Sequence, residues 1–157
     1  MPSDPLKPRR RIPWLWLTVV ACGGWLAVPN IRQSTAAERC PEQLRTLGDA
    51  LLLYLADHDL RLPLADRWAT DLSAYTHSQR PFSCPKIDLD GKREYGHAYV
   101  RSLSGLDIGN LGDLSAVPAI YDSTDRSWNA AGTPSGVPDG VCNVANLDGS
   151  VGTLRKK

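Results

Sequence analysis

The residues of this 157-residue chain that are best suited to chemistry are its cysteines and histidines. The cysteines form no Cys-x-x-Cys pair, which argues against a structural zinc site. The histidines are isolated in the sequence, and no Gly-x-Ser-x-Gly motif supplies a nucleophile. We therefore expect surface or packed histidines without a catalytic role, and no enzymatic activity. The residues concerned are Cys22, Cys40, Cys84, Cys142, His58, His77 and His97.

Carboxylates gather in two places. Asp88, Asp90 and Glu94 lie close together, and Asp57 is followed by Asp59. Hard oxygen ligands suit calcium, but neither spacing completes a calcium-binding loop. Aspartate is also common in turns, where it accepts hydrogen bonds from nearby backbone N–H groups. We expect no metal site and no cofactor, and we expect Asp57 to help end a helix.

The N-terminal segment decides on which side of a membrane these residues work. Residues 12–28 carry no charge, and a run of this length lies at the short end of those that span a bilayer. Tryptophans near both ends suit the membrane interfaces, and basic residues precede the run. We predict a cytoplasmic basic tail over 1–11, a transmembrane anchor over 12–29 and an extracytoplasmic domain over 30–157. The residues concerned are Trp14, Trp16, Trp25, Lys7, Arg9, Arg10 and Arg11.

Cys22 leaves two alternatives to a retained anchor. The residues before it, Val19, Val20 and Ala21, fit the pattern that a lipoprotein peptidase reads, which would lipidate Cys22. The other alternative is ordinary cleavage of a signal peptide. The run stays apolar beyond Cys22 and no good small-x-small site follows it, which favours the anchor. All three alternatives place the domain outside the cytoplasm.

After the anchor, the spacing of apolar residues predicts two helices that precede the strands. In residues 37–59 apolar residues recur at alternating spacings of four and three, and Pro41 suits the first turn of this helix. Further leucines widen the apolar stripe, as expected for a helix packed on more than one side. The stripe consists of Cys40, Leu44, Leu47, Leu51 and Tyr54, widened by Leu52, Leu53 and Leu55. Residues 66–75 predict a shorter helix with an apolar face of Trp68, Leu72 and Tyr75.

Strand patterns follow the helices. Asp90-Gly91 indicates one hairpin, residues 117–122 a single strand, and Asp148-Gly149 a closing hairpin with a tight two-residue turn. Residues 101–116 and 123–140 have the composition of long loops. This order predicts an α+β fold, in which an N-terminal membrane helix continues towards a long amphipathic helix packed on a small antiparallel sheet.

The exported cysteines predict a disulfide. An exported domain meets an oxidising compartment, where buried cysteine pairs tend to oxidise. Cys40 lies on the apolar stripe, and the chain from there to Cys84 is long enough to return beside it. We predict a Cys40–Cys84 bond, with Cys142 as the alternative partner, since three exported cysteines leave one unpaired.

The charge distribution excludes one class of partner. The formal net charge is +1, with 18 basic and 17 acidic residues. Four of those basic residues and only Asp4 among the acidic ones precede the apolar run, so the exported part is slightly acidic. A nucleic-acid-binding protein normally has a clustered basic face, and we therefore expect no nucleic-acid partner.

Short motifs in a fixed order carry a family resemblance. The chain resembles the pseudopilins of type II secretion, and more closely a bacterial prepilin-like family whose C-terminal domain carries a histidine, nine residues and then Asp-Gly. The similarity covers about residues 27–155. It is carried by "AVPNI" at the end of the anchor, Tyr54, Asp57, Asp59, Arg61, Pro63, Trp68, Leu72, Tyr75, Cys84-Pro85, Tyr95, Tyr99, Gly140, Asn143, Val144, Asp148, Gly149 and Val151.

Three departures from the family pattern separate this chain from a processed pilin. Arg11-Ile12-Pro13 stands where the family has its glycine-phenylalanine processing site and nearby glutamate, so the site is degenerate. Pro138 and Ser150 replace two histidines of the C-terminal domain. The missing processing site predicts a fixed, uncleaved subunit in place of a filament-forming one.

The resemblance implies a non-catalytic, pseudopilin-like protein of the bacterial inner (cytoplasmic) membrane, with one span and an extracytoplasmic head. It would be a structural or accessory component of a secretion, pilus-like or envelope assembly. Its partners would be the membrane and other envelope or pilin-like proteins, with no small-molecule substrate. The alternative function is a lipoprotein binding module that uses the long loops around Trp128 for recognition.

Overall fold

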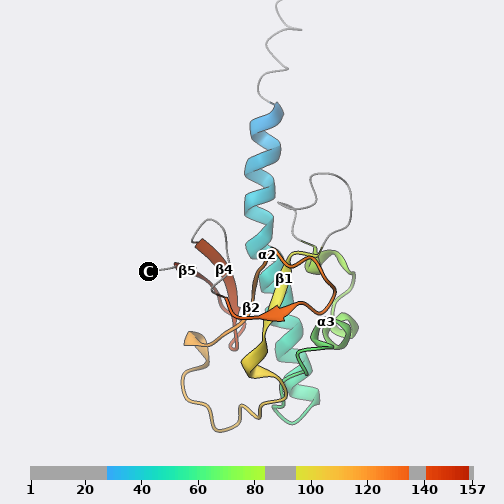
Figure 1. The fold of residues 1–157 in the computed structure, drawn as a ribbon, viewed down its shortest axis with the longest axis vertical. Helices are drawn as coiled ribbons and strands as arrows, with labels where there is room; N and C mark the ends of the chain where they lie inside the picture. The colour runs from blue at the N-terminus through green and yellow to red at the C-terminus, as the bar shows by residue number, and fades with distance from the viewer. Residues whose placement is uncertain (1–27, 84–94, 135–140, 156–157) are drawn as a thin grey trace, which may run out of the picture. The chain divides into compact units, whose positions relative to one another are not determined.

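The computed structural model describes residues 28–83, 95–134 and 141–155 (Figure 1). The chain divides into two compact units, residues 1–34 and 35–157. Within the described ranges, no helix is both long and apolar enough to cross a bilayer. The basic tail, nearly all of the predicted anchor, and Cys22 lie outside the described residues, as does the hairpin predicted at Asp90-Gly91.

The long helix α2 spans Val28–Asp57. The predicted stripe is confirmed, because Cys40, Leu44, Leu47 and Leu51 are fully buried and Tyr54 is half-buried. Burying such a stripe of large aliphatic side chains contributes about 1.5–3 kcal/mol per residue before the entropic cost of folding.

Two details of the predicted helix were wrong, the widening of its apolar stripe and the place of Pro41. Leu55 is buried, but Leu52 and Leu53 are 39% and 55% exposed, since the sheet and the loops pack on one side of α2 only. Pro41 lies inside the helix and not in its first turn, because helical residues continue before it as far as Val28. A proline there leaves the carbonyl group four residues earlier without its helical N–H donor.

The end of α2 is a turn built on two left-handed residues. The N–H group of Leu60 donates to the carbonyl oxygen of Leu55 at 3.0 Å, and that of His58 donates to the same oxygen at 3.3 Å. Asp59 and Leu60 have φ values of 50° and 60°. A helix C-terminus closed by such a bond normally places glycine at the first left-handed position, and here aspartate occupies it.

The sheet has five strands in the order β3-β1-β2-β4-β5. Three neighbouring pairs are antiparallel, but β1 and β3 are parallel, so the prediction of a wholly antiparallel sheet was wrong. The chain leaves β2, passes across the end of the sheet and adds β3 beside β1 in the same direction. The strands are β1 His97–Val100, β2 Pro118–Asp122, β3 Ala131–Gly132, β4 Val141–Asn146 and β5 Val151–Arg155.

The closing hairpin is confirmed, but its turn differs from the predicted one. The Gly149 N–H donates to the Asn146 carbonyl oxygen at 3.0 Å, and the Asn146 N–H donates to the Ser150 carbonyl oxygen at 2.8 Å. Leu147, Asp148 and Gly149 therefore form a three-residue loop, with Gly149 at φ 81°. This is the hairpin in which a type I turn is followed by a left-handed glycine. The strand predicted at 117–122 is confirmed as β2.

A short helix, α3 Trp68–Leu72, completes the domain. As predicted, Trp68 and Leu72 are buried, and the indole of Trp68 stacks on Tyr99 of β1 with ring centres 5.9 Å apart. Trp68 Nε1 also donates to the carbonyl oxygen of Ala130 at 2.9 Å. Single 3-10 turns cover Ser73–Tyr75, Arg80–Phe82, Arg101–Leu103 and Leu114–Ala116. The described structure is therefore an α+β domain.

Candidate functional site

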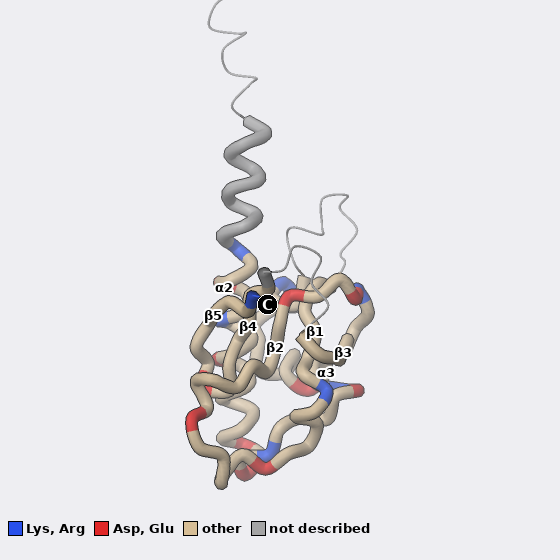
Figure 2. The backbone as a smooth tube through the Cα atoms, turned by 60° about the vertical axis from the view of Figure 1, so that its left-hand side comes forward, with Lys and Arg blue, Asp and Glu red and all other residues tan. Residues whose placement is uncertain are grey.

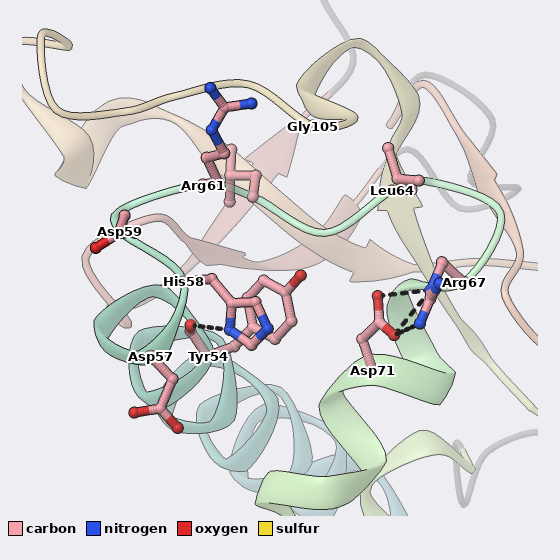
Figure 3. A pocket seen from close by; sticks show the side chains of 10 residues that line it. Tyr54, Asp57, His58, Asp59, Arg61, Leu64, Arg67, Asp71 and Gly105 are labelled. Carbon is pink, nitrogen blue, oxygen red and sulfur yellow. Dashed lines mark hydrogen bonds and ion pairs between the residues drawn. The ribbon is translucent and has the colours of Figure 1, made fainter.

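A cavity of about 590 Å³ opens at the C-terminal end of α2 (Figure 3). Both charged and apolar groups line it, and we call it the pocket. Three segments contribute to it: the end of α2 with the turn that follows, the stretch that includes α3, and the loop at Gly105. The lining residues are Tyr54, Asp57, His58, Asp59, Arg61, Leu62, Leu64, Arg67, Asp71 and Gly105.

Backbone pairing holds two of these segments together. Residues 60–63 lie antiparallel to residues 105–108, with Arg61 opposite Asp107. The Leu62 N–H donates to the Leu106 carbonyl oxygen at 2.9 Å, and the Ile108 N–H donates to the Leu60 carbonyl oxygen at 3.0 Å. Because Leu62 and Ile108 are buried, this short ladder is fixed to the core. The pocket therefore has one rigid wall.

An arginine–carboxylate pair forms the opposite wall. Arg67 Nε lies 2.9 and 3.1 Å from the two carboxylate oxygens of Asp71, and Nη2 lies 2.8 Å from Oδ1. The hydrogen bonds to Asp71 raise the pKa of Arg67 above its ordinary value. The Asp71 side chain is only 12% exposed, whereas that of Arg67 is 61% exposed. This two-pronged geometry fixes Asp71 and leaves part of the guanidinium open to solvent.

The floor of the pocket is aromatic. The rings of Tyr54 and His58 are stacked, with centres 3.9 Å apart, and His58 Nδ1 lies 2.9 Å from the Tyr54 carbonyl oxygen (Figure 3). The hydroxyl of Tyr75 donates to Asp57 Oδ2 at 3.0 Å. Burial raises the pKa of Tyr54, as does the nearby Asp71, and burial followed by the bond to Asp57 raises that of Tyr75. Both phenols therefore remain protonated near neutral pH, and that of Tyr75 donates its hydrogen bond to Asp57.

This arrangement is suited to binding. Among the described residues, no three side chains of His, Cys, Asp or Glu come together to hold a metal ion. Asp57, which was expected to help end the helix, is the last residue of α2, and its carboxylate accepts a hydrogen bond from Tyr75. The pocket itself was not predicted from the sequence. The one local signal for it was the spacing of Arg67 and Asp71, which places opposite charges on one face of a helix.

The other histidines lie elsewhere. His77 is exposed. His97 is buried at the start of β1, with Nδ1 3.3 Å from Oδ1 of Asp122 on the neighbouring strand. Asn143 of β4 donates to the other carboxylate oxygen of Asp122 at 2.6 Å. This polar row crosses three adjacent strands, and it depends on strand register that the sequence does not reveal.

The cysteines were predicted to form a disulfide, and that prediction still stands untested. Cys40 is buried on α2, while Cys84 lies outside the described residues. Cys142, the alternative partner, is a buried free thiol that lies 3.5 Å from the carbonyl oxygen of Asp122. Burial, followed by the charge of Asp122, raises the pKa of Cys142 to about 11. A thiol in this environment is a poor nucleophile at neutral pH.

Trp128 and the residue after it attach their loop to the core and to α3. Trp128 packs against Phe82 and Tyr95, with ring centres 5.0 and 4.8 Å away, and its indole N–H donates to Thr70 Oγ1 at 2.9 Å. Asn129 Oδ1 accepts hydrogen bonds from the N–H groups of Ala69 and Thr70 at 2.8 and 3.1 Å. The loop thus caps α3 from a distant part of the chain. Trp128 is engaged in packing, which weakens the alternative that it forms a recognition surface.

The pocket at the end of α2 is therefore the candidate functional site. Comparison with known proteins adds nothing further, because no family model, curated protein or solved structure matches the chain.

Proposed function

We propose that this protein is a non-catalytic, membrane-anchored, pseudopilin-like subunit that serves a structural or accessory role in a bacterial envelope assembly. The observation that carries the proposal is the order of its elements. A helix of 30 residues comes first, and its C-terminal half forms the core of an α+β domain with a sheet that closes in a hairpin. This order agrees with the resemblance drawn from the sequence.

The anchor is the second part of the proposal. Residues 12–28 are uncharged and follow four basic residues, so the basic tail stays in the cytoplasm and the sheet domain is exported. Arg9, Arg10 and Arg11 occupy the place of the processing site. Drawing these charges into an apolar filament core would cost at least about 2.5 kcal/mol for each charge on the lenient insertion scales. The subunit therefore remains tethered and uncleaved.

The proposal is tested at the two ends of the chain. A reporter enzyme that is active only after export, fused after Lys157, should be active, and a cytoplasm-only reporter at the same place should be silent. Mass spectrometry of the membrane fraction should find the N-terminal peptide intact. Strong activity from the cytoplasmic reporter would overturn the topology. A diacylglyceryl group on Cys22 would show the lipoprotein alternative, and recovery in sheared filaments without residues 1–11 would show a processed pilin.

A further inference from the structure

Three exposed leucines border the pocket. Leu60, Leu64 and Leu106 are 47%, 50% and 44% exposed, although each belongs to a segment fixed by backbone hydrogen bonds. Leu64 lies against Gly105 and Leu60 against Gly109, so the two side chains flank the segment that carries Leu106. We call these three residues the leucine ridge. They are three exposed apolar side chains on backbone that hydrogen bonds hold in place.

One of these leucines, Leu60, has a strained backbone conformation. Leu60 has a φ of 60°, a left-handed conformation that costs a side-chain-bearing residue about 1–2 kcal/mol. Glycine or asparagine would serve this turn better if its only role were to end α2. Strained residues of this kind occur often at functional sites, and here the strained residue presents an exposed apolar side chain.

The surroundings of the leucine ridge are acidic. Three aspartates line the pocket, Asp66 precedes Arg67, and Asp107 lies opposite Arg61 in the ladder. Arg61 and Arg67 are the cations of this set, so five aspartates against two arginines leave a net charge of −3. Acidic and basic segments both lie among the loops at the lower end of Figure 2. The three lining aspartates are Asp57, Asp59 and Asp71.

The apolar and acidic features form one surface, because Leu64 belongs to the leucine ridge and also lines the pocket. We propose that this surface docks a basic amphipathic segment of a partner protein. Apolar side chains of the segment would cover the leucine ridge, and its lysines or arginines would enter the pocket between the carboxylates. The observations behind this inference are independent of the anchor, and only the membrane setting of its experiment rests on the proposed function.

Charge complementarity selects this occupant over others. An anionic lipid surface or a nucleic acid would be repelled by the net negative charge. An apolar small molecule would bury the aspartates and arginines of the lining without offering them partners. A segment with both cationic and apolar side chains satisfies both features. Pairing of opposite charges would also steer the encounter and make binding depend on salt.

The experiment measures binding of a defined probe to the full chain in phosphatidylcholine nanodiscs. The probe is a fluorescein-labelled, 14-residue amphipathic peptide of leucine and lysine, followed by fluorescence anisotropy, with empty nanodiscs as the blank. We expect saturable binding that weakens as salt is added. The same peptide with glutamate in place of lysine should not bind. Absence of binding by the lysine peptide, or equal binding by the glutamate peptide, would overturn the proposal.

Matched variants locate the binding. Leu106→Ser, and separately Asp57→Asn with Asp59→Asn, should each weaken binding about fivefold to tenfold, the effect of losing about 1 kcal/mol of contact. Leu53→Ser removes another exposed leucine, on α2 and outside the leucine ridge, and should leave binding unchanged. Circular dichroism checks that each variant is folded. Equal loss from Leu53→Ser and Leu106→Ser would refute the assignment to this surface.

Two other occupants give distinct results. If the surface joins two copies of this chain, sedimentation velocity will show a dimer that Leu106→Ser dissociates. If it contacts lipid, the wild-type chain will bind added anionic vesicles more tightly than Leu106→Ser does. Either result would replace the proposed partner segment.

Discussion

Gly48 on α2 lies against the turn between β4 and β5, and this contact leads to a prediction that helix propensity alone would get wrong. A methyl group on Gly48 would lie 3.2 Å from both the Cα atom and the carbonyl oxygen of Gly149. Carbon atoms in favourable contact are about 3.5–4.0 Å apart. The contacted atoms belong to the backbone of a turn whose Gly149 has a φ of 81°, so they have little freedom to move away.

Two opposing terms set the size of the effect of Gly48→Ala. Alanine is favoured over glycine inside a helix by about 0.8–1.0 kcal/mol. Inserting a methyl group into a tight contact costs about 1–3 kcal/mol. The steric term is the larger one because the neighbour is backbone and not a flexible side chain. We therefore expect Gly48→Ala to lower the free energy of unfolding by on the order of 1 kcal/mol.

The assay is urea unfolding of the full chain in detergent, followed by tryptophan fluorescence. Gly112→Ala is the control, because a methyl group there would meet nothing within 4 Å. It should leave the free energy of unfolding unchanged or raise it slightly. If Gly48→Ala raised the free energy of unfolding by the full helix-propensity gain, α2 and the turn would not be in tight contact, and the reasoning would fail.

Three further predictions concern other parts of the domain. Asn129→Gly tolerates the positive φ but removes two hydrogen bonds to the first turn of α3, so thermal unfolding should show a loss of about 1–2 kcal/mol. An unchanged melting temperature would contradict the capping role. Because burial raises the pKa of Cys142 to about 11, its stabilising effect is complete below the pKa of the unfolded thiol, and stability should fall as pH rises towards 11. Cys142→Ala should flatten that decline, and an identical pH dependence in both proteins would refute the argument. Cys84→Ser should cost about 2–4 kcal/mol if Cys84 is bonded to Cys40, and non-reducing peptide mapping that joins Cys84 to Cys142 would exclude this pairing.

The elements that the sequence predicted correctly are those with a clear local pattern of apolar or turn residues. The spacing of Leu44, Leu47 and Leu51 identified the buried face of α2, and Asp148-Gly149 identified the last hairpin. In both cases neighbouring residues in the sequence settle the structure. The exposure of Leu53 was not predictable, because hydrophobicity shows which residues can be buried and not whether a partner element covers them.

Features that combine residues from distant segments could not be predicted from the sequence. The strand β3 has two residues, too few to show an alternation of apolar and polar side chains. It is a strand because its backbone pairs with the edge of β1. The pocket likewise combines the end of α2 with Arg67, Asp71 and the loop at Gly105. Each contributing residue is ordinary in its own segment. Only the fold brings them within reach of one another.

The cap that Asn129 provides has a consequence for the order of folding. The helix α3 has five residues, which is far too short to be stable alone, and Asn129 lies about sixty residues further along the chain. Closing so long a loop is an entropic cost that must be met before α3 gains its cap. The helix should therefore form late, together with the loop that covers it, and the two should also open together. Hydrogen exchange at Ala69 and Thr70 would then report the docking of residues 123–130, although these amides lie in a different part of the sequence.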